Sequence, residues 1–286
     1  MNARTLLKDL SMMTKPRIAV MVLLTTLVGY LLGAEGPIQT APMWCSLLGV
    51  LLVAASSSVL NQVMEREFDG RMDRTRNRPL PGGRMRPVEA LALGLLLAVA
   101  GTVLLVAMSN LLTTLLALAT LIVYLFVYTP LKRRTALNTI VGAVPGAMPP
   151  VLGWTASSGS VGPGALVLFA ILFLWQLPHF LSIAWMYRED YRRGGYRMLP
   201  LYDGDGSLTA RQMVLHCVAL CGLTCLPYLF RLGGGASLTV GVLSGLLFLV
   251  AALVFQNNKT RRNARIVMAA SLLYLPAVFG PLAMGL

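Results

Sequence analysis

The chain has 286 residues, of which 56% are hydrophobic and only 12% charged, and its formal net charge is +13. The charged fraction lies far below the rough quarter that is usual for soluble domains, which excludes an ordinary soluble protein. The positive charge makes nucleic-acid binding a hypothesis, which the positions of the charges along the chain test.

Hydrophobic stretches of about 20 residues, the length that a helix needs to cross a bilayer, recur along the whole chain. No soluble domain or long linker separates them. We therefore expect residues 1–286 to form one all-α, polytopic membrane domain. The predicted transmembrane helices number nine, at about 16–34, 42–66, 87–109, 111–129, 139–157, 164–187, 208–230, 236–256 and 265–285.

The basic residues are distributed very unevenly between the two predicted sides of the membrane. With the N-terminus inside, 23 of the 24 Lys and Arg residues lie on the inner side, and only Arg231 lies outside. This distribution follows the positive-inside rule, so the basicity reports topology and argues against nucleic-acid binding. The first span is too long for a signal peptide. We expect a multi-pass protein of a bacterial inner membrane with a cytoplasmic N-terminus and a periplasmic C-terminus, an organellar inner membrane being the alternative.

The second predicted span leads into a ladder of oxygen-bearing side chains. Asn61, Glu65, Asp69 and Asp73 stand four residues apart, a spacing that stacks them on one face of a helix. Gly70 predicts that this helix ends near Asp69, which makes Asp73 the least secure member. An acidic face at the end of a membrane helix is costly unless cations occupy it, and Mg²⁺ is the usual cation where phosphates are handled.

Basic residues are interleaved with this ladder and supply donors for phosphate groups. A loop anchored at lipid headgroups would explain the arginines but not the oxygen ligands in register. The segment therefore predicts a metal-diphosphate site at a membrane surface. The interleaved residues are Arg66, Arg71, Arg74, Arg76 and Arg78.

Two further inner loops carry candidate site residues. After the fourth span, Pro130 is followed by three consecutive cations, of which Lys132 is the first; they either bind diphosphate or anchor the loop. After the sixth span, Asp190 is the natural metal ligand from the second half of the chain. His179, earlier on that span, is either a hydrogen-bonded core histidine or an axial contact for haem.

The fifth predicted span is rich in small residues and prolines. Small residues permit close helix packing, and the prolines are expected to distort the helix. The span either lines a cavity or serves packing alone. The residues concerned are Gly142, Gly146, Gly153, Pro145, Pro149 and Pro150.

Taken together, these motifs resemble the intramembrane UbiA-type prenyltransferase superfamily, and most closely its protohaem IX farnesyltransferase branch. The first motif reads Asn61-x3-Glu65-x3-Asp69-x2-Met72-x-Arg74-Thr75-x2-Arg78-Pro79. The resemblance spans essentially the entire chain. Its other segments are Tyr128-Thr-Pro-Leu-Lys132-Arg133-Arg134-Thr with Asn138, Pro149-Pro150-x-x-Gly153-Trp154, and Trp175-Gln-x-Pro178-His179-Phe180 followed by Asp190-Tyr191.

The resemblance implies nine transmembrane helices around a central cavity with a cytoplasmic polar cap, and prenyl transfer from a diphosphate with Mg²⁺ as cofactor. By position, Asn61, Glu65, Asp69 and Asp190 would hold the metal, with Asp69, Arg74 and Asp190 as catalytic residues. The chain lacks the second pair of aspartates four residues apart that many superfamily members have, which leaves the second metal without obvious ligands. The implied substrate-binding residues are Arg74, Arg78, Lys132, Arg133, Asn138 and His179.

The resemblance also implies the reaction. The expected function is transfer of a farnesyl group from farnesyl diphosphate to a vinyl group of protohaem IX (haem B), with addition of water, giving haem O and diphosphate. Association with haem A synthase or with terminal oxidase assembly is a further hypothesis. The alternatives are another acceptor, such as a quinone precursor or a chlorin, and a transporter or channel for cations. The apolar outer half of the predicted bundle argues against a transporter.

Overall fold

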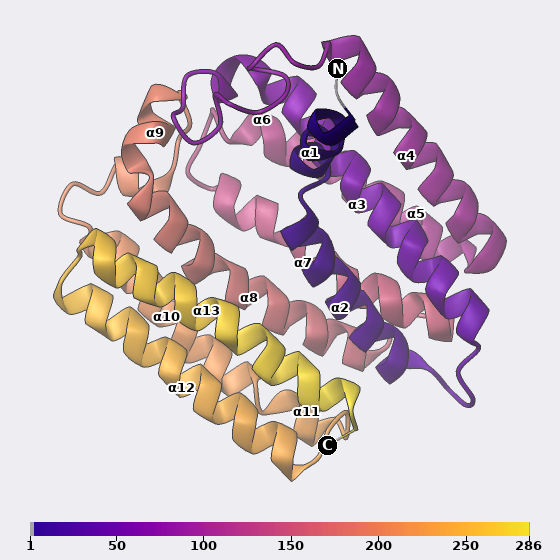
Figure 1. The fold of residues 1–286 in the computed structure, drawn as a ribbon. Helices are drawn as coiled ribbons and strands as arrows, with labels where there is room; N and C mark the ends of the chain where they lie inside the picture. The colour runs from indigo at the N-terminus through magenta and orange to yellow at the C-terminus, as the bar shows by residue number, and fades with distance from the viewer. Residues whose placement is uncertain (1–2, 286) are drawn as a thin grey trace.

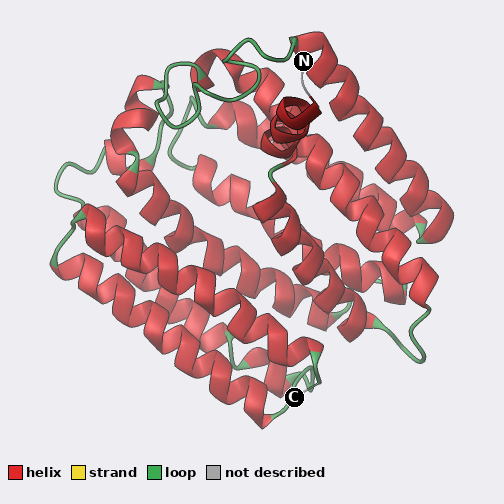
Figure 2. Ribbon diagram, viewed as in Figure 1, coloured by secondary structure: helices red, strands yellow, loops and turns green. Residues whose placement is uncertain are grey.

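The computed structural model describes residues 3–285, and within that range it consists of helices joined by turns and loops (Figures 1 and 2). This confirms the predicted all-α fold. The α-helices are α1 (Ala3–Thr14), α2 (Pro16–Gly33), α3 (Thr40–Asp69), α4 (Pro87–Met108), α5 (Leu111–Ile122), α6 (Thr129–Leu131), α7 (Asn138–Ser158), α8 (Pro163–Met186), α9 (Arg188–Arg193), α10 (Ser207–Leu223), α11 (Leu226–Leu229), α12 (Gly235–Asn257) and α13 (Arg261–Ala283). A π-helix, Val123–Tyr128, joins α5 to α6, and a 3₁₀ turn, Leu199–Leu201, follows α9.

Within the described residues, eight helical segments are long and apolar enough to cross a membrane, one fewer than predicted. The remaining predicted span, 139–157, which is the fifth in chain order, corresponds to α7, which has 21 residues. Its glycines, prolines and hydroxyl side chains make it less apolar than the other eight. Because α7 packs between α2 and α8, it needs less apolar surface than a helix that faces lipid.

The helices pack against sequence neighbours and against distant segments, and Figure 1 shows the N-terminal and C-terminal halves lying side by side. In the N-terminal half α3 packs along α4, and α2 along α7. In the C-terminal half the largest buried cluster joins α8, α10, α12 and α13 around Phe248, Phe255 and Tyr274. The short helices α1, α6 and α9 and the loop after α3 gather at one end of the bundle (Figure 1).

Close approach of α2 and α7 depends on two glycines. A Cβ atom on Gly29 would lie 1.9 Å from the backbone oxygen of Pro150, and one on Gly153 would lie 1.9 Å from that of Thr26. Larger side chains at these positions would force the helices apart, so the expected role of small residues in packing is borne out at Gly153. The helix α7 continues through its three internal prolines, so the expected distortion does not interrupt it.

The outer surface of the bundle is apolar where lipid would contact it. Helix α4 has little of its length buried, and its Leu96 and Val103 are 66% and 61% exposed. Exposed aliphatic side chains in such numbers would cause aggregation in water but match the hydrocarbon region of a bilayer. The polar cluster described next lies at the end of α3 where α1, α6 and α9 gather.

Candidate active site

Three buried polar side chains line one face of α3 at its end. Asn61, Glu65 and Asp69, here called the polar ladder, occupy successive turns and are only 2%, 5% and 1% exposed. Buried carboxylates are costly unless cations or donors neutralise them. Helix α3 ends at Asp69 with Gly70 as its cap, as the sequence predicted, so Asp73 lies on the following loop.

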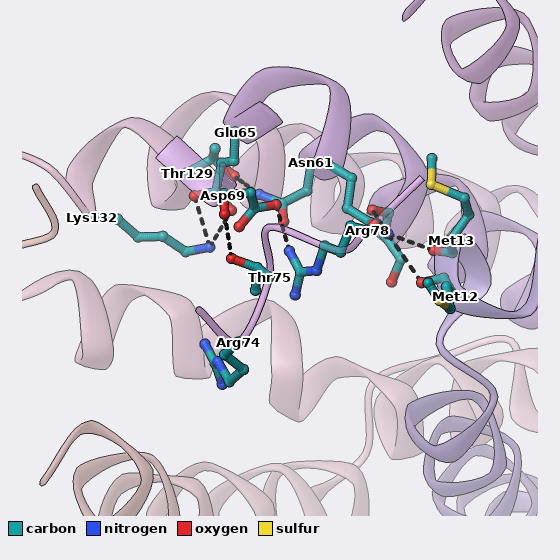
Figure 3. A network of polar contacts seen from close by, with 12 residues as sticks. Met12, Met13, Asn61, Glu65, Asp69, Arg74, Thr75, Arg78, Thr129 and Lys132 are labelled. Atoms are coloured by element: carbon teal, nitrogen blue, oxygen red, sulfur yellow. Dashed lines mark hydrogen bonds and ion pairs between the residues drawn. The ribbon is translucent and has the colours of Figure 1, made fainter. Parts of the chain in front are cut away.

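Each member of the polar ladder has a partner from another segment, as Figure 3 shows. Lys132 Nζ lies 3.0 Å from both carboxylate oxygens of Glu65, and Arg78 Nη1 lies 2.6 Å from Asp69 Oδ2. Asn61 Nδ2 donates to Thr129 Oγ1 at 3.0 Å. The structure therefore brings together five of the predicted site residues: the ladder, Lys132 and Arg78.

A π-helix shapes the segment that carries Lys132. In the π-helix Val123–Tyr128, an extra residue widens a turn, and Thr129 Oγ1 donates to the carbonyl of Tyr124 at 2.9 Å. Such bulges are rare and often lie at functional sites. The result aims Thr129 at Asn61 and places Lys132 opposite Glu65, just beyond the end of α6.

Lys132 is held by aromatic rings as well as by Glu65. Its Nζ lies 4.6 Å from the ring centre of Tyr128 and 5.9 Å from that of Tyr196. Burial alone would lower the pKa of Lys132, but the Glu65 carboxylate outweighs it and raises that pKa above its ordinary value. Lys132 is therefore charged at neutral pH. Burial also raises the pKa of the Tyr196 hydroxyl, which stays neutral.

The loop after α3 is fixed over the ladder by contacts at both of its ends. Thr75 Oγ1 donates to the carbonyl of Asp69 at 2.8 Å, and Arg84 pairs with the buried Asp9 of α1 at 3.0 Å. Gln62 Nε2 donates to the carbonyl of Met13 at 2.9 Å, which ties α1 to α3. These contacts hold Arg78 in position beside Asp69.

Lys15, which joins α1 to α2, is a further cation near the ladder that the sequence analysis did not single out. Its backbone is left-handed, with φ of 52°. Burial, together with the charges of Arg78 and Lys132, lowers the pKa of Lys15 to about 7. A lysine directly before the proline that begins the first span was the available signal.

Asp190, the predicted metal ligand of the second half, is bound elsewhere in this structure. Its carboxylate accepts from the guanidinium of Arg193 and from the backbone N–H of Asp73, and Arg193 also pairs with the Asp73 carboxylate at 2.5 Å. We call these three residues the loop latch. Partial burial opposes ionisation, but the bonds from Arg193 and the Asp73 amide hold the pKa of Asp190 below its usual value.

Residues 3–285 contain no group of three or more His, Cys, Asp or Glu side chains close enough to hold a metal ion. Asp190 therefore does not complete a carboxylate cluster with Glu65 and Asp69 in this arrangement, and its metal role stays a prediction. The oxygen atoms of the ladder are nonetheless of the kind that Mg²⁺ binds. One of them, Glu65 Oε1, has no well-directed hydrogen bond.

The remaining predicted substrate contacts lie at separate positions. Arg74 donates to the Tyr191 hydroxyl at 3.0 Å and lies over the ring of Tyr187, and Arg133 lies 4.3 Å from the ring centre of Phe68. The buried Asn138 donates from Nδ2 to two backbone carbonyls, at 2.6 and 2.7 Å. Its contacts here are with the chain itself, and its substrate role is a prediction that no contact tests.

His179, in the middle of the bundle on α8, is oriented by α13. Ser271 Oγ lies 2.6 Å from the carbonyl of Met268, which can accept the serine proton. His179 Nδ1 lies 2.7 Å from the same Oγ, and in the tautomer that donates from Nδ1 the lone pair on Nε2 is free. Trp175 stacks on the imidazole at 5.1 Å. Nothing in the sequence pattern indicated the contact between His179 and Ser271.

The comparisons with known proteins agree with this architecture. The model of the UbiA prenyltransferase family matches residues 22–275, which is most of the chain. The chain belongs to the UbiA prenyltransferase family. Among solved structures, digeranylgeranylglyceryl phosphate synthase shares the fold with a TM-score of 0.80 at 18% identity, over 98% of each chain. A UbiA homologue from Archaeoglobus fulgidus bound to DMAPP and Mg²⁺ has a TM-score of 0.67 at 16% identity, over 95% of this chain and 99% of the other.

Sequence relatives within the UbiA family are more specific. A protoheme IX farnesyltransferase from Solibacter usitatus is 44% identical over 96% of this chain and 97% of its own length. One from Salinibacter ruber is 43% identical, with 96% of each chain covered. A mitochondrial protoheme IX farnesyltransferase from Arabidopsis thaliana is 38% identical over 92% of this chain and 62% of its own length. The predicted branch of the UbiA family is thereby confirmed.

Proposed function

We propose that this chain transfers a farnesyl group from farnesyl diphosphate to a vinyl group of protohaem IX, with addition of water, and releases haem O and diphosphate. The relatives named protoheme IX farnesyltransferase at 38–44% identity support the reaction. The observation that carries the site is the buried polar ladder with Lys132 and Arg78, set at one end of an apolar bundle.

Lys132 and Arg78 are the groups that would bind the diphosphate. Breaking the allylic C–O bond leaves a delocalised cation on the farnesyl chain and negative charge on the departing diphosphate. Fixed cations stabilise that charge most strongly where water is excluded. In the free protein these cations rest on Glu65 and Asp69, and we propose that diphosphate takes their place as the partner. Arg74 and Arg133 would extend the same positive surface.

The ladder would bind Mg²⁺ once its cations have turned to the diphosphate. Its residues fit the ion because they offer carboxylate and amide oxygens only, one of them without a directed hydrogen bond. Asn61, Glu65 and Asp69 would be ligands, and Asp190 would join from the second half if the loop latch opens. When bound, the metal would supply further neutralisation of the leaving diphosphate. The Mg²⁺ in a solved UbiA homologue supports this proposal.

His179 would orient the acceptor in the interior of the bundle. An imidazole nitrogen with a free lone pair, fixed through its other nitrogen, is a suitable ligand for the iron of a haem. Ser271 and Trp175 hold the ring in that orientation. Apolar walls would protect the allylic cation from premature reaction with water.

The charged end of the bundle would face the cytoplasm. Nearly all of the Lys and Arg residues lie at that end, and the positive-inside rule supports a bacterial inner membrane with the N-terminus inside. Farnesyl diphosphate, which is charged at one end, would enter with its head at this aqueous face. Association with haem A synthase or with terminal oxidase assembly stays a hypothesis.

The direct test uses purified protein, haem B, farnesyl diphosphate and Mg²⁺, with products identified by mass spectrometry. We expect haem O in the complete mixture and none when Mg²⁺ is chelated. If no haem O forms while a quinone precursor or a chlorin is prenylated, the acceptor in this proposal is wrong. A variant with Glu65→Gln that inserts normally but yields no product ties the reaction to the ladder.

A further inference from the structure

A second charged region lies at the same end of the bundle, away from the polar ladder. A cavity of about 970 Å³ opens between the loop after α3, the end of α8, α9 and the start of α13. Arg188, Lys259 and Arg261 line it together with the rings of Trp185 and Tyr187. We call it the mouth cavity.

Aromatic rings hold the guanidinium groups of the mouth cavity. Arg188 lies over the ring of Trp185 with 4.8 Å between the guanidinium carbon and the ring centre. Arg261 and Arg74 both lie against Tyr187, at 5.7 and 5.1 Å. A guanidinium that rests its face on a ring keeps the N–H donors along its edge free. The donors of Arg188 and Arg261 are thereby available to an oxygen ligand, whereas Arg74 already donates to the Tyr191 hydroxyl.

The cations of the mouth cavity are not neutralised in the way that Lys132 and Arg78 are. Within the described range, Lys259 and Arg261 have no carboxylate at ion-pair distance, although the exposed Asp205 lies near enough to Lys259 to interact with its charge. Arg188 has only Glu189, at 3.9 Å. The two aspartates in the lining, Asp73 and Asp190, are already paired with Arg193 in the loop latch. The cavity therefore presents an excess of unused positive charge to an incoming anion.

The mouth cavity stands above His179 on the same pair of helices. Met186, which lines the cavity, follows His179 by seven residues on α8, which is two turns along the same face and a rise of about 10 Å. On α13, Arg261 precedes Ser271, the partner of His179. If the centre of the acceptor lay beside the imidazole, substituents of moderate length on the acceptor would therefore reach the cations of the mouth cavity.

We infer that the mouth cavity is the subsite for the carboxylates of the acceptor, with Lys259 and Arg261 as its principal ligands and Arg188 beside them. Resting on the proposed function, this inference assigns the two propionate groups of protohaem to the cavity and its iron to the level of His179. Guanidinium and ammonium donors pair well with carboxylates. The diphosphate head is left to Lys132 and Arg78, and Arg74, which lines the cavity against Tyr187, borders both sites.

The experiment is a haem B titration of the full chain in lipid nanodiscs, followed by the haem absorption band, without farnesyl diphosphate. The test variant is Lys259→Gln/Arg261→Gln, and the matched control is Arg262→Gln/Arg265→Gln, which removes two exposed cations from the same helix end. We expect haem B affinity to fall at least about 10-fold in the test variant, as for lost charged hydrogen bonds, and to stay near wild type in the control.

A second ligand, the dimethyl ester of haem B, isolates the carboxylates. The wild type should bind the ester about as weakly as the test variant binds haem B, and the substitutions should cause no further loss. An unchanged haem B affinity, or an equal loss for haem B and ester, overturns the inference. A loss that appears only in nanodiscs with anionic lipid also overturns it, because the cations then bind headgroups.

This titration separates the inference from the proposed function. It measures acceptor binding without turnover, whereas haem O formation by the wild type tests the reaction. If the wild type makes no haem O but binds haem B with the predicted dependence on carboxylates, the reaction is wrong and the subsite stands. If haem O forms and the titration shows no such dependence, only the subsite is wrong. The KM for farnesyl diphosphate should not change in the test variant.

Discussion

The polar ladder and the mouth cavity lie at the same end of the bundle, but their basic side chains have different partners. In the ladder, Lys132 and Arg78 are paired with buried carboxylates. In the mouth cavity, Arg188 and Arg261 rest on aromatic rings and keep their donors free. Lys132 and Arg78 must therefore give up their carboxylate partners before they can bind an anion. The cations of the mouth cavity can bind an anion without breaking an existing ion pair of this kind. The difference suits a metal-bound diphosphate at the first and simple carboxylates at the second.

The largest effect is expected from removing a carboxylate of the polar ladder. Asp69→Asn removes a negative charge that metal and Arg78 share, so we expect haem O turnover to fall about 10²–10³-fold while the protein still inserts. Mass spectrometry of the product measures it. The control is Glu67→Gln, which removes an exposed carboxylate from the same end of α3 and should cost less than about fivefold. Near-normal turnover in Asp69→Asn and Asp190→Asn together would contradict the metal assignment.

The next largest effect is expected from disrupting the close packing of α2 against α7. Gly153→Leu places a side chain where a Cβ would already lie 1.9 Å from the carbonyl oxygen of Thr26. We expect a loss of at least about 1–3 kcal/mol of stability, seen as a lower unfolding temperature in detergent. Gly222→Ala adds a methyl group where no atom lies within 4 Å and is the control. Equal unfolding temperatures for both variants would rule out close α2–α7 contact.

A smaller effect is expected from removing the contact between His179 and Ser271 in the interior of the bundle. Ser271→Ala removes the hydrogen-bond partner of His179 Nδ1, so we expect about 10-fold weaker haem B binding and an altered iron-ligand signature in resonance Raman spectra. Ser271→Thr keeps the hydroxyl group and should leave both haem B affinity and the Raman signature close to those of wild type. Ser244→Ala, which removes a similar serine-to-carbonyl bond on α12, serves as the control. A normal spectrum for Ser271→Ala would remove this serine from the acceptor site.

The smallest effect should come from the loop latch. Arg193→Gln removes the donor that holds the pKa of Asp190 down. A depressed carboxylate pKa stabilises the folded state at neutral pH, and this contribution disappears as pH falls through the folded-state value. The variant lacks this contribution, so its unfolding temperature should lie below that of wild type at neutral pH, and the two should converge as the pH falls through the Asp190 pKa, below its ordinary value of 3.8. Identical profiles would show that the latch contributes nothing to stability.

Much of this site followed from sequence because its residues are local. Asn61, Glu65 and Asp69 share one helix face by spacing alone, and Gly70 marked the end of that helix. Partners from distant segments did not follow, because the π-helix that aims Thr129 and the pairing of Lys132 with Glu65 depend on tertiary packing. The sequence predicted that Asp190 faces the ladder, whereas Arg193 and Asp73 bind its carboxylate in this structure. The position of α7 in the chain was predicted, but its burial between α2 and α8 was not.

The most direct test of the account measures how Mg²⁺ affects binding of a non-cleavable farnesyl diphosphate analogue to wild type and to Asp69→Asn. We expect Mg²⁺ to raise the affinity of the wild type at least about 10-fold and to leave that of the variant nearly unchanged. Equal affinity in both proteins, with or without a chelator, would contradict the claim that the buried ladder holds a metal-bound diphosphate.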